Sequence, residues 1–153
     1  MILFFYVSSA LILPIIFITG CGKQELITLE DKYYNNNTFI TSTATEIDSY
    51  LENKESFILY TYNNYCTLKI PCENIFESFM TNNNISILSI PFSELKNSKL
   101  SKKIKYAPTV IIIDKGKVIT SLNAESNNDL PKYQDVDEFT NWIKEYIVID
   151  RGI

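Results

Sequence analysis

The chain has 153 residues, which is enough for one domain, and its hydrophobic content of 46% is ordinary for a protein with a packed core. The formal net charge is -4 and neither sign is clustered, so nucleic acid is not an expected partner. The chain contains no histidine. This excludes catalysis by Ser-His or Cys-His pairs and HExxH zinc sites, and we expect neither a metal nor another cofactor.

The first twenty residues carry no charged side chain and lead to Ile18-Thr19-Gly20-Cys21. A run of roughly 20 apolar residues can span a bilayer, but it is also typical of an export signal. Its end resembles a bacterial lipobox, in which small residues precede a cysteine that receives diacylglycerol. The resemblance implies that residues 1–21 are a lipoprotein signal peptide and lipobox, and that lipidated Cys21 holds the protein on the extracytoplasmic face of the cell membrane. No Lys or Arg precedes the apolar core, so an uncleaved anchor remains the alternative.

Polar residues follow, and we expect a flexible tether over residues 22–37. Thr38 to Ser42 is a short β-prone run. Thr43 is then the expected N-cap of a helix, and Glu46 three residues later completes a capping box. The hydrophobic segment from Phe57 to Tyr62 predicts the next strand.

A second helix is expected from Pro71 to about Thr81, with proline in its first turn. Ile85 to Ile90 predicts another strand, and the lysine-rich segment from Ser93 to Lys105 predicts a broken helix. Thr109 to Ile113 is apolar without alternation, which is typical of a central strand that is covered on both faces.

Asp114 to Lys117 predicts a hairpin turn into a strand from Val118 to Leu122. After a polar loop, which includes Asp129 to Tyr133, Asp135 is the expected cap of a last helix. The predicted order is βαβαβαββα, within one domain over residues 38–149.

Two segments of this order resemble thioredoxins. In Phe57 to Cys66, Tyr65 stands where thioredoxins usually have Trp, and Cys66 where they have the nucleophilic cysteine. About forty residues later, Tyr106-Ala107-Pro108-Thr109 precedes an apolar strand and a Lys-Gly turn, similar to the cis-proline segment and final hairpin of the family. The resemblance covers roughly Thr38 to Ile147.

The resemblance implies a thioredoxin-like three-layer α/β sandwich, in which helices flank a mixed central sheet. It also implies a cis bond between Ala107 and Pro108 beside Cys66, and a substrate-binding surface formed by Tyr65, Ala107, Pro108 and Thr109. Within the family, the chain most resembles membrane-anchored extracytoplasmic proteins, including the bacteriocin-transport accessory type.

The cysteine spacing departs from the Cys-x-x-Cys of thioredoxins, because five residues separate Cys66 from Cys72. If the helix begins at Pro71, residues 67–70 form a loop and the two sulfur atoms can meet. If it begins directly after Cys66, a rise of about 1.5 Å per residue separates the two Cα atoms by roughly 9–10 Å. That separation exceeds the roughly 7 Å limit for a disulfide.

The role of Cys72 stays open at this stage. It precedes Ile75 and Phe76 by three and four residues, so it lies on the apolar helix face, where a cysteine is also a small core residue. Exported proteins nevertheless tend to pair their cysteines, and such a disulfide would be either catalytic or static. Tyr60 occupies the position at which thioredoxins usually have a buried carboxylate, and its strand contains no Asp or Glu. Proton transfer would therefore need water or Lys69.

The sequence thus predicts thiol–disulfide exchange on exported proteins: Cys66 attacks as the thiolate, Cys72 resolves, and the backbone at Ala107-Pro108 pairs with an extended substrate. The expected partners are thiols or disulfides of exported proteins or peptides, the membrane through the lipid on Cys21, and a membrane redox protein. The alternative is a redox-inactive thioredoxin-like module that binds a peptide in the same groove and serves a transport or surface-assembly system.

Overall fold

A computed structural model describes residues 25–63 and 71–150, so that the predicted lipobox, Tyr65, Cys66 and Lys69 lie outside the described residues. Within this part of the chain, no helix combines the length and the apolar content needed to cross a membrane. Strands and helices follow the predicted order βαβαβαββα. The elements are β1 (Phe39–Thr41), α1 (Ala44–Glu52), β2 (Phe57–Tyr62), α2 (Cys72–Asn83), β3 (Ile87–Pro91), α3 (Phe92–Leu95), β4 (Thr109–Asp114), β5 (Lys117–Ser121) and α4 (Val136–Lys144).

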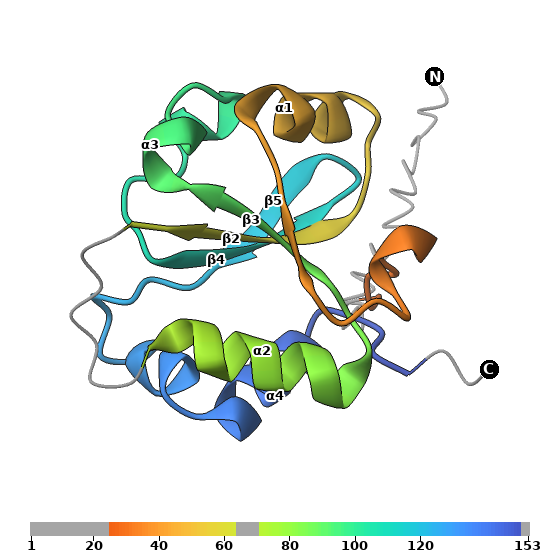
Figure 1. Cartoon of the computed structure of the whole chain (residues 1–153), viewed down its shortest axis with the longest axis vertical. Coiled ribbons are helices and arrows are strands. Elements are labelled where there is room, and N and C mark those ends of the chain that lie inside the picture. The colour runs from red at the N-terminus through yellow and green to blue at the C-terminus, as the bar shows by residue number, and fades with distance from the viewer. Residues whose placement is uncertain (1–24, 64–70, 151–153) are drawn as a thin grey trace, which may run out of the picture.

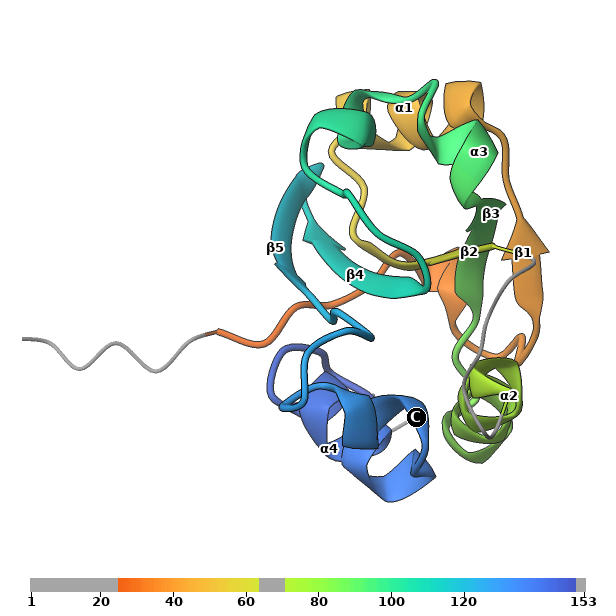
Figure 2. The ribbon, with the colours of Figure 1, turned by 90° about the vertical axis from the view of Figure 1, so that its left-hand side faces the viewer.

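The strands form one mixed sheet of order β1-β3-β2-β4-β5. β1, β3 and β2 are parallel, whereas β4 runs antiparallel to both of its neighbours, β2 and β5. α1 and α3 cover one face of the sheet, and α2 and α4 cover the other (Figures 1 and 2). The predicted three-layer α/β sandwich, with a mixed central sheet between helices, is therefore confirmed.

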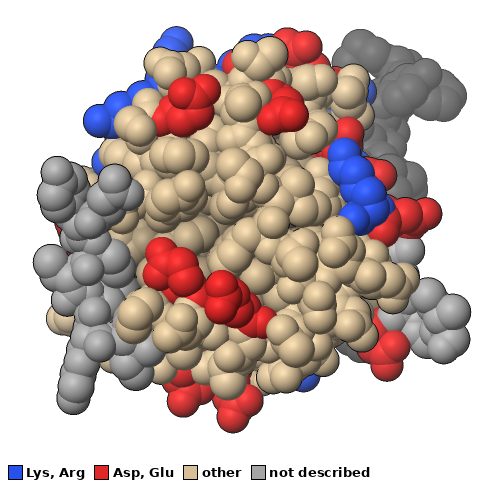
Figure 3. All heavy atoms as spheres, in the orientation of Figure 1, with Lys and Arg blue, Asp and Glu red and all other residues tan. Residues whose placement is uncertain are grey.

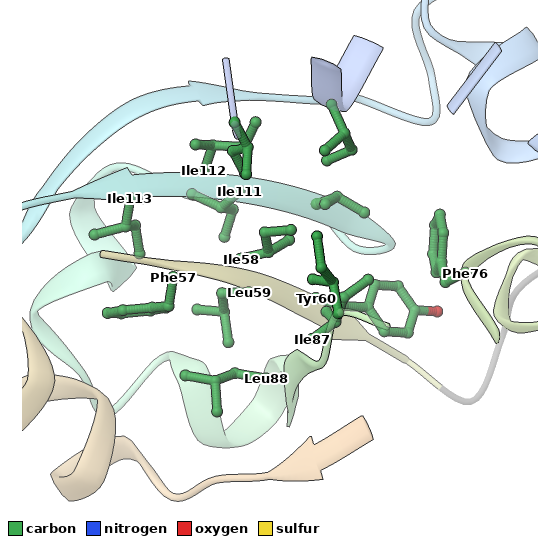
Figure 4. Packing of buried hydrophobic residues seen from close by; sticks show 14 of the residues in the cluster. Phe57, Ile58, Leu59, Tyr60, Phe76, Ile87, Leu88, Ile111, Ile112 and Ile113 are labelled. Atoms are coloured by element: carbon green, nitrogen blue, oxygen red, sulfur yellow. The ribbon is translucent and has the colours of Figure 1, made fainter. Parts of the chain in front are cut away.

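The core is centred on β2 and β4, which lie side by side inside the sheet. Their apolar residues are almost completely buried because helices cover both faces, and Figure 4 shows these side chains interleaved above and below the two strands. The non-alternating apolar segment from Thr109 is thus the inner strand that the sequence predicts. β5 lies at the edge and alternates between half-buried and exposed residues.

Short-range signals set the ends of several elements as expected. The Thr43 side chain accepts a hydrogen bond from the Glu46 backbone N–H, and the Glu46 carboxylate accepts one from the Thr43 backbone N–H, which completes the capping box. The Asp135 side chain caps α4. In the β4–β5 turn, Lys115 and Gly116 both have positive φ, as tight two-residue hairpin turns require.

The expectation of a flexible tether over residues 22–37 is corrected for its described part. Ile27, Leu29, Tyr33 and Tyr34 are buried in the core cluster. Ile27 and Leu29 are two positions apart in extended chain, so both side chains face inward while their neighbours are exposed. Ile27 also forms a parallel bridge with Ile147 beyond α4. This N-terminal segment belongs to the folded domain.

Candidate functional site

The first turn of α2 carries Cys72. Pro71 occupies the N-cap with an extended ψ of 119°, and the helix begins at Cys72 itself. Of the two geometries open to the sequence, the structure has the one in which Cys72 starts a helix. Cys72 therefore does not lie two turns inside a helix that starts at Cys66. Its side chain is completely buried and belongs to the core cluster.

A hydrogen-bonded chain joins the Cys72 thiol to a carboxylate. The Tyr60 hydroxyl oxygen lies 3.3 Å from Cys72 Sγ, and the same hydroxyl donates to Glu73 Oε1 across 2.6 Å. Glu73 Oε2 lies 3.7 Å from the sulfur. Tyr60 comes from β2 and reaches across to α2, and Figure 4 shows its ring beside Phe76 with the hydroxyl directed toward that helix.

The direction of this chain follows from the single hydroxyl proton of Tyr60. Because that proton lies in the short bond to the Glu73 carboxylate, the tyrosine oxygen can only accept from the Cys72 thiol, which is also in position to donate to Glu73 Oε2 across 3.7 Å. Burial raises the pKa of Tyr60 far above its usual value, and its hydrogen bonds to Cys72 and Glu73 raise it further. Tyr60 therefore keeps its proton at neutral pH, and Glu73 is the group that can accept one.

The expectation that proton transfer would need water or Lys69 did not take this carboxylate into account, and Lys69 lies outside the described residues. Strand β2 indeed lacks a carboxylate, but the half-buried Glu73 of α2 supplies one beside the sulfur. The signal was present in the sequence as an acidic residue directly after Cys72, in the first turn of a helix. Only the position of the Tyr60 hydroxyl in the structure shows that Glu73 is connected to Cys72.

The predicted proline segment directly precedes β4 in the chain and lies beside the residue that follows β2. The Ala107–Pro108 peptide bond is cis, as expected. Asn63, directly after β2, donates from Nδ2 to the Ala107 carbonyl across 3.1 Å. Ala107 and Pro108 are half-exposed, whereas Thr109 is buried and its hydroxyl donates to the Tyr106 carbonyl. Of the predicted substrate-binding residues that are described, Ala107 and Pro108 are therefore partly exposed and Thr109 is not.

Tyr133, for which the sequence predicts a loop, packs against this segment. It lies in a short 3-10 turn, Leu130–Tyr133, and is completely buried. Its hydroxyl donates to the carbonyls of Leu122 (3.0 Å) and Pro108 (3.3 Å), and its ring lies 6.0 Å from that of Phe76 in α2. The proline segment and the helix that carries Cys72 are therefore held against one tyrosine.

No cluster of three or more His, Cys, Asp or Glu side chains that could hold a metal occurs among the described residues. The chemistry that the described side chains can perform is the movement of a thiol proton. Cys72 provides the thiol, Tyr60 connects it to a carboxylate, and Glu73 can receive the proton.

No family model and no curated protein sequence matches the chain. Among solved structures, a variant of the Halobacterium salinarum thioredoxin superposes with a TM-score of 0.55 at 15% identity, over 76% of this chain and 96% of that one. The Schistosoma mansoni thioredoxin gives 0.51 at 17% identity, over 72% and 97%. Oxidized thioredoxin O2 from Arabidopsis thaliana gives 0.50 at 14% identity, over 70% and 92%. Similarity at these identities shows a shared fold.

Proposed function

Starting from the thioredoxin-like fold, we propose that this protein is a membrane-tethered, extracytoplasmic thiol–disulfide oxidoreductase that acts on exported proteins through Cys66 and Cys72. The observation that most supports the proposal is the chain from the Cys72 thiol through Tyr60 to the Glu73 carboxylate. A cysteine that served only to fill the core would gain nothing from this carboxylate, whose partial burial costs free energy. A cysteine that must lose a proton gains an acceptor.

The proposed reaction exchanges one disulfide for another. The Cys66 thiolate attacks a sulfur of the substrate disulfide, which forms a mixed disulfide and expels one substrate thiolate. The Cys72 thiolate then attacks the Cys66 sulfur, which closes the Cys66–Cys72 disulfide and releases the second substrate thiolate. The substrate gains two electrons and the cysteine pair loses two. The reverse sequence oxidises a substrate dithiol.

Proton transfer belongs to the second attack. Because the thiolate is the nucleophile, Cys72 must lose its proton before it can resolve the mixed disulfide. In the proposal that proton moves to the Tyr60 oxygen while the Tyr60 proton moves to Glu73, so the tyrosine carries no charge at either end of the step. The backbone around Ala107 and Pro108, two partly exposed residues, would pair with the extended substrate chain.

The decisive experiment traps the mixed disulfide. In Cys72→Ser nothing remains to resolve it, so exported proteins should accumulate as covalent adducts that thiol-blocked non-reducing gels display and a reductant removes. The double variant Cys66→Ser/Cys72→Ser is the matched control and should trap nothing. Absence of adducts from both variants, with the protein folded and exported, would overturn the proposal.

The anchor belongs to the same proposal. Cys21 would carry diacylglycerol and residues 1–20 would be removed, so that the domain faces exported proteins and a membrane dithiol or disulfide protein that resets the cysteine pair. Cys21→Ala should lose lipid labelling and leave the membrane fraction. A full-length, membrane-bound Cys21→Ala protein would instead identify the apolar run as an uncleaved anchor.

A second function is favoured by one observation, the complete burial of Cys72 within the core cluster. A redox-inactive module that binds a peptide, as an accessory to transport or surface assembly, would also bury this side chain. That function predicts either a disulfide with a reduction potential below about −300 mV or two thiols that never exchange. Measuring the potential of the cysteine pair in the purified protein distinguishes the two functions.

A further inference from the structure

A small pocket lies beside the Cys72–Tyr60–Glu73 chain, on the α2 side of the sheet. Its volume is about 200 Å³, and its walls come from β1, β2, β3 and the first turn of α2. The residues that line it are Phe39, Tyr60, Tyr62, Glu73 and Ser89. Three of these five side chains are aromatic and one is acidic. The volume is smaller than the roughly 300–1,000 Å³ of pockets for whole small-molecule ligands, and it suits a single side chain.

The aromatic rings form a continuous wall. Tyr60 packs against Phe39 with ring centroids 5.8 Å apart, and it stacks on Tyr62 at 5.7 Å. Phe39 and Tyr62 are only partly buried, so their rings also border the open space of the pocket. The negative face of an aromatic ring attracts a cation within about 6 Å of its centroid.

Glu73 adds the complementary charge. Its two carboxylate oxygens provide about four acceptor positions, and the contacts to Tyr60 and Cys72 use one on each oxygen. An apolar occupant would cover the remaining positions without a donor, which costs free energy, and an anion would be repelled. A cation with N–H donors is the occupant that both the rings and the carboxylate favour.

The helix that carries Glu73 has the same sign of charge along its length. α2 contains Glu73 and Glu77 and neither Lys nor Arg. Figure 3 shows acidic atoms gathered across the middle of the face that α2 occupies in Figure 1, with basic atoms confined to other parts of the view. Nothing on this helix competes with an incoming cation.

We infer that this pocket binds a lysine or arginine side chain of the substrate protein, next to the cysteine that takes part in exchange. The inference rests on the proposed function and deepens it, because it names the substrates as exported proteins with a basic residue near their reactive cysteine. The cation would lie between the Phe39 and Tyr62 rings and the Glu73 carboxylate. Its binding would place the substrate chain along the opening beside Cys72.

The test compares peptides that differ in one charge. The four positions tested are the two residues before a cysteine and the two residues after it. For each position, one labelled peptide carries arginine and its partner carries the neutral isostere citrulline. Binding is measured with S-methylcysteine peptides, which cannot exchange, and turnover with the matching disulfide peptides, both on the full chain in detergent. In at least one pair, arginine should bind about fivefold to tenfold more tightly than citrulline and raise kcat/KM to a similar extent.

Variants assign the preference to the pocket. Phe39→Leu, Tyr62→Leu and Glu73→Gln should each bring the ratio of arginine to citrulline binding toward one, because each removes a ring or the charge. Glu77→Gln, one turn further along α2 and not part of the pocket wall, should leave the ratio unchanged. Thermal unfolding of each variant identifies any that fail to fold, and the peptide comparison on the unaltered protein needs no variant.

The outcomes separate the inference from the proposed function. Equal binding of arginine and citrulline in all four pairs would overturn the inference, even if every disulfide peptide were turned over. A preference for arginine that survives in Phe39→Leu, Tyr62→Leu and Glu73→Gln would overturn the assignment to this pocket. An arginine preference without turnover of any peptide would support the pocket and overturn the proposed function.

Discussion

The hydrogen bond between Tyr60 and Glu73 can be measured by a double-mutant cycle. Tyr60→Phe removes the hydroxyl but keeps the ring that packs at 4.9 Å against Phe76. Glu73→Ala removes the acceptor, and any loss of its favourable interaction with the helix N-terminus appears in both the single and the double variant, so it cancels. The cycle therefore measures the coupling between the two side chains, including the part that passes through their shared contact with Cys72 Sγ.

The expected magnitude follows from the geometry. A separation of 2.6 Å lies in the range of charge-assisted O–H···O⁻ bonds, and hydrogen bonds to charged groups contribute about 1.5–3 kcal/mol net. Glu73 is only half-buried, so water can replace part of the bond when tyrosine is lost. We expect a coupling free energy of about 1–2 kcal/mol between the two positions.

Urea unfolding of the wild-type protein, the two single variants and the double variant at pH 7 gives the coupling directly. Tyr62→Phe with Glu77→Ala is the matched control on the same strand and helix, and these two changes should add within about 0.5 kcal/mol. Additivity of Tyr60→Phe and Glu73→Ala would refute the hydrogen bond and, with it, the structural basis for Glu73 as the proton acceptor.

Three further predictions concern pH and packing. Burial raises the pKa of both Tyr33 and Tyr60 well above the unfolded value of about 10. The stability that each neutral tyrosine contributes is therefore fully present below pH 10. As the pH rises above 10, the free energy of unfolding falls by about 1.4 kcal/mol per pH unit for each tyrosine. Equilibrium unfolding between pH 9 and about 12 should show this slope, and Tyr60→Phe should about halve it; a flat profile would contradict the burial argument. Leu29→Ala should lower the unfolding free energy by about 2–4 kcal/mol, whereas Leu26→Ala, whose side chain is 45% exposed, should change it by less than about 0.5 kcal/mol. If Leu29→Ala and Leu26→Ala had equally small effects in denaturant titrations, residues 25–34 would be a tether and not part of the folded domain. Thr61→Val should raise stability by about 1 kcal/mol, because the Thr61 hydroxyl is buried without a hydrogen-bond partner among the described residues; a lower melting temperature would show that the hydroxyl is satisfied.

The parts of the fold that could be predicted are those with local causes. The bounds of β2 follow from a mostly apolar run, and the start of α1 follows from the reciprocal bonds of Thr43 and Glu46. Pro71 likewise places the start of α2 within one residue. Each of these signals acts over a few residues, so it can be recognised in the sequence without knowledge of the tertiary structure.

The errors have a different cause, because they depend on partners far along the chain. Ile27 and Leu29 lie in a polar segment and become core residues only where the chain from Ile147 lies beside them. Tyr133 follows a proline in a polar loop, yet its hydroxyl bonds the carbonyl of Pro108, 25 residues earlier. Composition predicts loops at both places, and only the tertiary structure shows what these side chains meet.

The carboxylate of the site was missed because it lies on α2 and not at position 60, where the resemblance to thioredoxins led us to look for it. At position 60 the resemblance implies an acidic residue, which would be almost completely buried, because the side chain present there is only 2% exposed. Ionising a carboxylate there would require removing it from water. Tyr60 instead carries a neutral hydroxyl across the width of its ring to α2, and Glu73 meets it at the edge of the core, where it stays half-exposed. The charge can thus form at lower cost while it remains connected to the buried sulfur. A search of β2 for an acidic residue could not find it, because the longer side chain at position 60 moves the acceptor to another element.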